Sequence, residues 1–296
     1  MRNYYLALKL SFQIWKQHKH SEHVKMNFLQ KVSSYISEAL FFGCIILIRG
    51  KKGMMFVSLY FWMRYADDVL DKEIKINVTP NVFLKDAIDT ASLLSEEQGG
   101  RSYYENTNDF LLWFVYHISL DKKKLHEIIM QFFFVFEKEL SYRRENFFPT
   151  KEELRILAAG WGNAIFAGTF YFFGGDFSKF QNIVGERMYV FQETDWLYGQ
   201  FDDLAHGLIF FTEEDFKSMS TGEAFDHAFF KKLGNREFLE KQEKFMEWRR
   251  NKKNQLEDEF NKMSYPLNGH PSDSGLLNFL LKYFLVPKFK KRLARC

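Results

Sequence analysis

The hydrophobic positions of the chain recur with a helical period, and no stretch alternates between apolar and polar residues as a strand would. The clearest case is residues 123–144, which begin amphipathic and then become apolar almost all round, as a central buried helix does. The same period predicts further helices at residues 28–48, 54–72, 82–95, 106–119, 151–173, 178–208, 212–233, 235–262 and 273–286.

Glycine, proline and asparagine gather between these segments, for example in RGKKG at 49–53 and YPLNGHPSDSG at 265–275. Two helix starts carry a capping signal, a threonine followed by acids, in TKEEL (150–154) and TEEDF (212–216). No shift in composition marks a linker. The pattern therefore predicts one all-α domain over residues 1–296, with its two ends, 1–27 and 287–296, peripheral and mobile.

Composition narrows the classes of function. Hydrophobic residues make up 46% of the chain and 35 residues are Phe, so a large aromatic core can form. The net charge of +3 lacks the concentrated positive charge of a nucleic-acid binder, so no nucleic-acid partner is expected. The only cysteines are Cys44 and Cys296, which excludes a disulfide framework or a cysteine-rich zinc site and indicates a reducing compartment.

The predicted location is cytoplasmic, with one alternative left open at the C-terminus. No signal peptide is recognisable at the N-terminus, and no uninterrupted apolar run reaches the length of a membrane span. FLLKYFLV (279–286) leads into the basic sequence PKFKKRLARC. This segment is either a last core helix with a solvated end or an apolar helix that makes a peripheral contact with an anionic membrane surface.

Three carboxylates interrupt an apolar stretch in LYFWMRYADDVLDK (59–72). Residues four apart share one face of a helix, so Asp67 and Asp71 point the same way, and Arg64 lies one turn before Asp67. Because the preceding turns are apolar, this acidic face continues a buried face, where carboxylates require cations. Oxygen ligands one turn apart suit Mg²⁺, although a solvated helix end produces the same run of acids.

A second acidic stretch, FQETDWLYGQFDDLAHG (191–207), also interrupts an aromatic-rich helix. Asp195, Gly199 and Asp203 follow one another at steps of four and therefore share a face, with Asp202 beside it. Two such faces, opposed across a helical bundle, would form a pocket for a metal cluster and a diphosphate.

Together the two stretches resemble the squalene/phytoene synthase family, which belongs to the class I isoprenoid synthases. The first motif of that family has aromatic residues, then Arg, two residues and Asp-x-x-x-Asp, and the sequence matches it at Arg64, Asp67 and Asp71. The likeness covers about residues 28–215. It implies a single-domain helical bundle around a central cavity that binds a prenyl diphosphate.

Further matches support this resemblance. The second family motif is followed at Gln192, Asp202, Asp203 and Gly207. FLQKVSSY, close to the N-terminus, resembles the serine-rich diphosphate loop of the family, with Ser34 as the best match.

The departures from the family concern its second motif and its middle segment. The family Asn is Asp195, its Arg is Tyr198, its central Asp is Gly199 and its final Arg is Leu208. The middle-segment Tyr has no counterpart, since the aligned position is either Ile156 or Ala159. These positions serve the family in handling two diphosphates. Asp195, Gly199 and Asp203 instead fit the looser metal-binding triad of one-substrate terpene synthases.

The resemblance implies roles for particular residues. A cluster of two or three Mg²⁺ ions would be held by aspartates of both stretches, namely Asp67, Asp68, Asp71, Asp195, Asp202 and Asp203. Arg64, Ser34 and Gln192 would contact the diphosphate. Phe61 and Trp196 would face the allylic carbocation, because aromatic rings stabilise a cation without capturing it. Tyr198 would line the cavity or act as a base.

The sequence thus predicts a Mg²⁺-dependent terpenoid synthase that ionises a farnesyl- or geranylgeranyl-class diphosphate. The departures favour a one-substrate terpene synthase. The alternatives are a head-to-head squalene- or phytoene-type prenyltransferase, and a non-catalytic relative that acts as an assembly factor.

Overall fold

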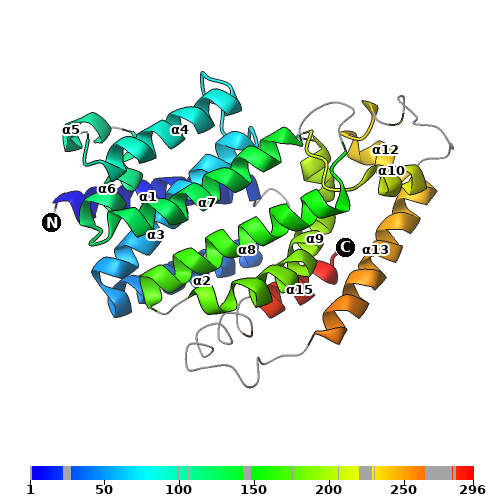
Figure 1. Cartoon of the computed structure of the whole chain (residues 1–296). Helices are drawn as coiled ribbons and strands as arrows, with labels where there is room; N and C mark the ends of the chain where they lie inside the picture. Colours follow the sequence, from blue (N-terminus) through cyan, green and yellow to red (C-terminus); the bar gives the residue numbers. More distant parts are fainter. Residues whose placement is uncertain are drawn as a thin grey trace. The chain divides into compact units, whose positions relative to one another are not determined.

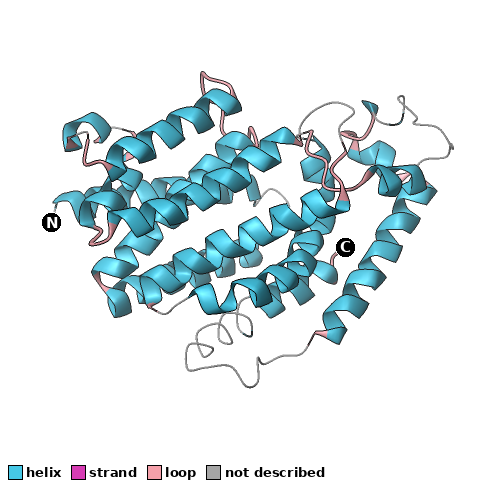
Figure 2. Cartoon of the chain, viewed as in Figure 1, coloured by secondary structure: helices cyan, strands magenta, loops and turns pink. Residues whose placement is uncertain are grey.

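The computed structural model describes residues 2–22, 28–98, 100–105, 107–142, 148–174, 177–205, 207–219, 229, 231–263, 282 and 285–296. Every regular element among these residues is a helix, as Figure 2 shows, so the predicted all-α class is confirmed. The chain divides into two compact units: residues 1–137 with 164–175 form unit 1, and residues 138–163 with 176–296 form unit 2. One domain over residues 1–296 stays a prediction.

Unit 1 is built around α3 (Lys51–Leu70), which packs against α1 (Arg2–Glu22), α2 (Phe28–Arg49), α4 (Pro80–Ser95) and α6 (Phe110–Ile118) (Figure 1). α6 is apolar nearly all round, and each of its residues except His117 is buried, as expected for a helix surrounded by protein. The short α5 (Arg101–Tyr104), which no periodic pattern predicted, precedes α6.

The prediction that residues 1–27 are peripheral was wrong for α1. This helix packs against α3 and α6. Ala7, Ile14 and Trp15, spaced as one helix face, are buried. Lys9 and Gln13 are exposed, but so are the apolar residues Tyr5, Leu8 and Phe12, so apolar positions fall on both sides of the helix and no single stripe stands out in the sequence.

α2 and α3 are joined by the predicted break at 49–53, where Gly50 has a φ of 53°. Beyond this turn the two helices approach each other closely at Gly53. A Cβ atom placed there would lie 2.9 Å from Ile46 Cα and would overlap the carbonyl of Ile45. Glycine at position 53 therefore permits the backbone contact that sets α2 against α3.

Unit 2 is built around α9 (Gln181–Ala205), which follows the 3-10 helix η2 (Phe177–Phe180) and packs against α13 (Glu243–Lys262) and α15 (Val286–Leu293). α10 (Glu213–Met219) and α12 (Arg236–Glu240) also pack on α13, which is orange in Figure 1. The core between these helices is largely aromatic and aliphatic and contains Leu204, Ile209, Phe211, Phe216, Met219, Phe229, Leu233, Leu239 and Phe245.

Both predicted helix caps are confirmed. The Thr150 hydroxyl accepts from the backbone N–H of Glu153 at 3.2 Å, and the Glu153 carboxylate accepts from the N–H of Thr150 at 2.7 Å. Thr212 and Asp215 make the same reciprocal pair at 3.1 and 3.0 Å. These capping boxes begin α8 (Lys151–Phe173) and α10.

Other helix boundaries differ from the prediction in detail. The helix expected at 123–144 is α7 (Lys122–Ser141), and the one expected at 235–262 is broken into α12 and α13. The Asn235 side chain caps α12, and a turn after it separates the two helices. The helix predicted at 273–286 lies almost wholly outside the described residues, and of 212–233 the structure describes chiefly α10.

One described helix, α8, is long and apolar enough to cross a membrane by length and composition, so the expectation that no segment reaches this length was too strict. Half of its most apolar window is buried inside the protein. At the C-terminus, Phe289 and Leu293 of α15 are buried in unit 2. The apolar side of this predicted peripheral segment is therefore covered by protein, and its lysines remain at the surface.

Candidate functional site

The first acidic stretch lies at the C-terminal end of α3. Asp67 and Asp68 are in the last turn, and Asp71 is the residue that caps the helix, its N–H bonded to the Asp67 carbonyl at 2.8 Å. The chain then turns through Lys72 at a φ of 61°, while the Asp68 carbonyl accepts from the N–H groups of Glu73 and Ile74. The three carboxylates are thus gathered where a helix ends and its direction changes.

Arg64 holds two of these carboxylates. Its Nη1 donates to Asp67 Oδ2 at 2.8 Å, and its Nε lies 3.4 Å from Asp68 Oδ1. This confirms that Arg64 and Asp67 share a face. Asp68 is the most deeply placed of the acids, at 2% exposure, whereas the Asp67 side chain is 22% exposed. The structure therefore puts Asp68 inside the protein and leaves Asp67 accessible to solvent.

The position of the acids at this end of α3 has an electrostatic consequence. A helix carries partial negative charge at its C-terminus, so carboxylates there are disfavoured and cations are favoured. The Arg64 guanidinium supplies one positive charge beside Asp67 and Asp68. Aspartate oxygens at such a helix end are also hard ligands of the kind that Mg²⁺ takes. Within the described part of the chain, no three His, Cys, Asp or Glu side chains form a ready-made metal group.

The second acidic stretch lies on α9, and the structure confirms that Gly199 and Asp203 share a face. A Cβ atom at position 199 would lie 3.3 Å from Asp203 Oδ2 and 3.6 Å from Oδ1, so the carboxylate lies over the glycine. A larger side chain at this position would displace the carboxylate.

Asp195, one turn before Gly199, is engaged by the C-terminal helix. Lys288 Nζ lies 3.2 Å from Asp195 Oδ2, and Arg292 Nη1 pairs with Oδ1. The Arg292 guanidinium also lies over the Tyr198 ring, 5.5 Å from its centroid. Two cations of α15 thus occupy the side of Asp195 that the sequence assigned to a metal. The four-residue spacing of Lys288 and Arg292 puts both cations on one face of α15, but it does not indicate that this face meets Asp195.

α15 is anchored by its aromatic side chain. Phe289 stacks on Phe260 of α13, with ring centroids 4.1 Å apart, and meets Phe191 of α9 edge-on at 5.5 Å. Because this contact is buried, the ion pairs with Asp195 are held on a packed helix.

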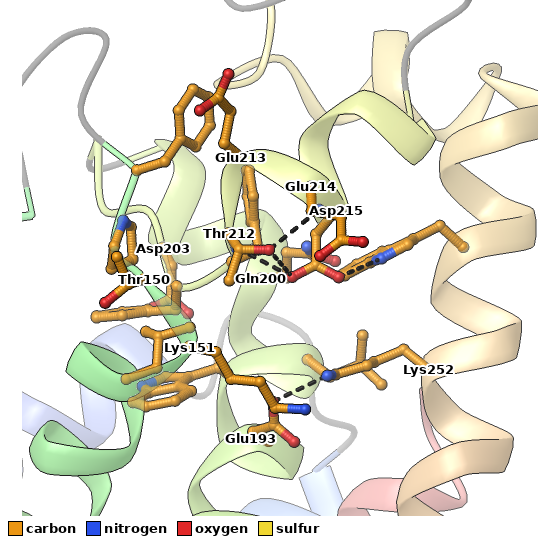
Figure 3. Close-up of a pocket in the computed structure, with 18 of the residues that line it drawn as sticks. Thr150, Lys151, Glu193, Gln200, Asp203, Thr212, Glu213, Glu214, Asp215 and Lys252 are labelled. Atoms are coloured by element: carbon orange, nitrogen blue, oxygen red, sulfur yellow. Dashed lines mark hydrogen bonds and ion pairs between the residues drawn. The ribbon is translucent and has the colours of Figure 1, made fainter.

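A cavity of about 380 Å³ lies in unit 2 (Figure 3). Trp196 and Asp203 are the predicted site residues in its lining. The Trp196 ring stacks on Phe210, with centroids 5.0 Å apart and planes 13° apart. The charged and polar lining residues labelled in Figure 3 are Thr150, Lys151, Glu193, Gln200, Asp203, Thr212, Glu213, Glu214, Asp215 and Lys252.

Glu193 is a residue of this cavity that the sequence reasoning missed. It is 6% exposed, and its Oε1 accepts from the Tyr189 hydroxyl at 2.6 Å and from Lys252 Nζ at 2.9 Å. Its Oε2 is buried without a hydrogen-bond partner in the described structure. Burial, together with the neighbouring carboxylate, raises the pKa of Tyr189, so this phenol stays protonated and donates. The helical period would have placed Tyr189 and Glu193 on one face.

The remaining predicted residues lie in several places. Phe61 is a core residue of unit 1, with its ring 5.0 Å from that of Phe42. Gln192 is a half-buried residue of α9, and Tyr198 is 39% exposed. Ser34 lies in α2 and Asp202 in α9, but their side chains are outside the described residues.

No protein-family model matches the chain, and no curated protein or solved structure is significantly similar to it.

Proposed function

We propose that this protein is a Mg²⁺-dependent terpenoid synthase that ionises an allylic prenyl diphosphate of the farnesyl or geranylgeranyl class. The observation that carries the proposal is the carboxylate-rich end of α3, where Arg64 binds Asp67 and Asp68 after an apolar helix. The order of Arg64, Asp67 and Asp71, followed later by Asp203, is that of the squalene/phytoene synthase resemblance.

The chemistry of the donors fits the metal. Asp67 and Asp71 offer hard oxygen ligands at a helix end that favours positive charge. On α9, the carboxylate of Asp203 lies over Gly199 and remains a candidate ligand. When bound, Mg²⁺ would neutralise the charge that develops on the departing diphosphate.

The residues of the chain would bind and orient the substrate. Arg64, already aligned by two carboxylates, can donate further N–H groups to diphosphate oxygens. Trp196, stacked on Phe210 at the wall of the cavity in unit 2, offers an aromatic face to an allylic cation. Each such face stabilises a cation by ~0.5–2 kcal/mol.

A one-substrate reaction is favoured over head-to-head coupling. Gly199 stands where the resembling family has an aspartate, and the Asp203 carboxylate fills the space above it. Tyr198 and Leu208 likewise replace arginines of the family motif. The chain thus lacks charged groups with which the family handles two diphosphates.

A second candidate function is that of a non-catalytic relative, an assembly factor that keeps the helical fold. The ion pairs of Asp195 with Lys288 and Arg292 favour it, because they engage a predicted metal ligand with protein cations. On that hypothesis α15 is a permanent part of the α9 surface.

The experiment incubates the full chain and Mg²⁺ with geranyl, farnesyl and geranylgeranyl diphosphate, and measures released pyrophosphate and product mass. A product with the carbon number of its substrate supports the terpene synthase, and a doubled carbon number supports head-to-head coupling. Metal-dependent release should be lost in Asp67→Asn and kept in Asp89→Asn, a matched change at an exposed aspartate of α4. Absence of release from every substrate by the folded protein would favour the assembly factor.

A further inference from the structure

An exposed apolar row runs along the outside of α2. Leu47 is 85% exposed, Ile48 78%, Leu40 62% and Phe41 37%, and Cys44 between them is exposed as well. Their spacing of one, three, three and one residues traces a single stripe on a helix. Single exposed apolar side chains are ordinary, but a contiguous stripe of five marks a surface that contacts something apolar.

The opposite side of α2 packs against α3. Ile45 is 7% exposed and faces Gly53 of α3 at the close backbone approach. The Phe42 ring meets the rings of Phe61 and Tyr60 of α3 at 5.0 and 5.1 Å. The row at 40, 41, 44, 47 and 48 therefore points away from α3, and these side chains are not needed for the core of unit 1.

Positive charge adjoins the row. Lys51 and Lys52 are exposed at the start of α3, directly after the stripe ends. The neighbouring Arg49 donates to the carbonyl oxygens of Phe172 and Phe173, which anchors this end of α2 to the end of α8. No Asp or Glu occurs in residues 39–66, so the segment has no negative charge of its own.

Aromatic residues border the same surface. Tyr60 is 44% exposed and lies against Phe42, while the ring of Phe41 lies 5.3 Å from that of Phe42. Aromatic side chains, with tyrosine presenting an apolar ring and a polar hydroxyl, are favoured where protein meets the boundary between lipid chains and headgroups. An apolar stripe, flanking aromatics and two lysines are the features of a helix that lies in a lipid interface.

We propose that the exposed face of α2 is a docking surface for an anionic lipid bilayer. The apolar row at 40, 41, 44, 47 and 48 inserts at the boundary between the lipid headgroups and the acyl chains. Lys51 and Lys52 contact the anionic headgroups. The apolar segment Ala39–Arg49 is too short to span a bilayer, so the helix lies in the plane of the surface. A symmetric contact between the α2 faces of two copies is a poorer occupant, because residues 39–66 offer no acid to these lysines. This inference does not depend on the proposed function.

The test is co-sedimentation of the full chain with vesicles of phosphatidylcholine alone and of phosphatidylcholine with phosphatidylserine. The protein should bind the anionic vesicles more strongly, and less so as salt is raised. Leu47→Ser with Ile48→Ser should weaken binding about tenfold or more. Lys51→Gln with Lys52→Gln should weaken it about fivefold for each lysine on anionic vesicles only.

Matched variants in unit 1 serve as controls. Val82→Ser with Leu93→Ser changes two exposed apolar residues of α4, and Lys123→Gln with Lys124→Gln changes two adjacent exposed lysines of α7. Neither pair should alter vesicle binding. Unfolding curves should be unchanged in the Leu47 and Ile48 variant, since both side chains are exposed.

Three results would overturn the proposal. The first is that the unmodified chain does not sediment with anionic vesicles. The second is that the controls weaken binding as much as the stripe variants. The third is a concentration-dependent dimer, seen by sedimentation velocity, that Leu47→Ser with Ile48→Ser dissociates while lipid binding is absent. In that case a second copy covers the stripe.

Discussion

At the residue scale, Arg249 illustrates how a buried charge is accommodated in this aromatic protein. Arg249, at 5% exposure, donates through Nη1 to the Leu197 carbonyl at 2.8 Å and to Gln200 Oε1 at 2.6 Å. Its guanidinium also lies 4.7 Å from the Phe201 ring centroid. Because buried charges without partners are costly, such contacts fix where each charged side chain can sit.

Arg64 provides a test of this point. Arg64→Gln removes the guanidinium that lies 3.4 Å from the carboxylate of Asp68. Asp68 is almost completely buried. We expect the free energy of unfolding to fall by about 1–3 kcal/mol, less than for a fully buried pair, because Arg64 is a third exposed. Urea unfolding measures the change. Arg236→Gln, which breaks an exposed pair with Glu240, should cost under ~0.5 kcal/mol, and an equal loss in both variants would contradict the assigned burial.

His126 makes part of the stability dependent on pH. Its Nδ1 lies 2.8 Å from the hydroxyl of buried Tyr116, and since burial raises the pKa of that phenol, the hydroxyl donates to a neutral imidazole. Burial lowers the pKa of His126, although Glu127 opposes this. The unfolded chain, with a histidine pKa of about 6.5, therefore binds the proton first as pH falls. Stability from this group is present above pH ~6.5 and is lost below it.

We accordingly expect the urea midpoint to fall between pH 7 and pH 5, where histidine titrates. In His126→Asn, whose side-chain oxygen can still accept from Tyr116, this part of the pH dependence should disappear. His117→Asn, which changes the exposed histidine of α6, serves as the control and should retain it. An unchanged slope in His126→Asn would show that the Tyr116 contact does not control the titration.

At the element scale, the approach of α2 and α3 rests on one glycine. Alanine in a helix is normally about 1 kcal/mol more favourable than glycine. At Gly53, however, the new methyl group would overlap the Ile45 carbonyl, which is backbone and cannot move aside as a flexible side chain can. Gly53→Ala should therefore destabilise unit 1 by about 1–3 kcal/mol.

Thermal unfolding of Gly53→Ala and Gly43→Ala separates the two effects. Position 43, on α2, has open space where the methyl group of an alanine would lie, so alanine there should be neutral or stabilising. Stabilisation by both substitutions would mean that the two helices do not approach each other as closely as described.

Most of the helices could be predicted because residues close together in the sequence determine where a helix begins and ends and which face is apolar. The caps at Thr150 and Thr212, the break at Gly50 and the span of α8 all follow from short-range pattern and turn chemistry. α1 was missed because its apolar residues lie on both its exposed and its buried sides, so no single apolar stripe stands out in the sequence. The break between α12 and α13 was missed because no glycine or proline marks it.

At the scale of the whole molecule, the sequence predicted the site contacts between residues that are close together in the chain. It did not predict which distant residues pair with the candidate ligands. Sequence spacing placed Arg64 beside Asp67, and Gly199 beneath Asp203. It could not show that α15 reaches back to Asp195, since that pairing joins residues distant in sequence and depends on tertiary packing of Phe289. Long-range contacts of this kind decide which acids remain accessible.

The pairing of α15 with Asp195 separates the two candidate functions. In a terpenoid synthase, Lys288 and Arg292 compete with Mg²⁺ for this carboxylate, so Lys288→Gln with Arg292→Gln should strengthen metal binding. Two partly exposed pairs contribute together about 1–2 kcal/mol, which corresponds to roughly tenfold in affinity. Titration calorimetry with MgCl₂ and no substrate measures this directly. The buried stack of Phe289 on Phe260 should keep α15 in place in the variant.

Lys290→Gln with Lys291→Gln is the matched control, because it removes the same charge from exposed positions of the same helix. If this control strengthens Mg²⁺ binding equally, the effect is one of net charge and not of competition at Asp195. In an assembly factor, the Lys288 and Arg292 variant gains no metal affinity and only loses the two ion pairs, so its unfolding midpoint falls while the titration stays flat. A gain in Mg²⁺ affinity therefore indicates that Asp195 is a metal ligand, whereas a lower unfolding midpoint with no gain in affinity indicates a structural ion pair.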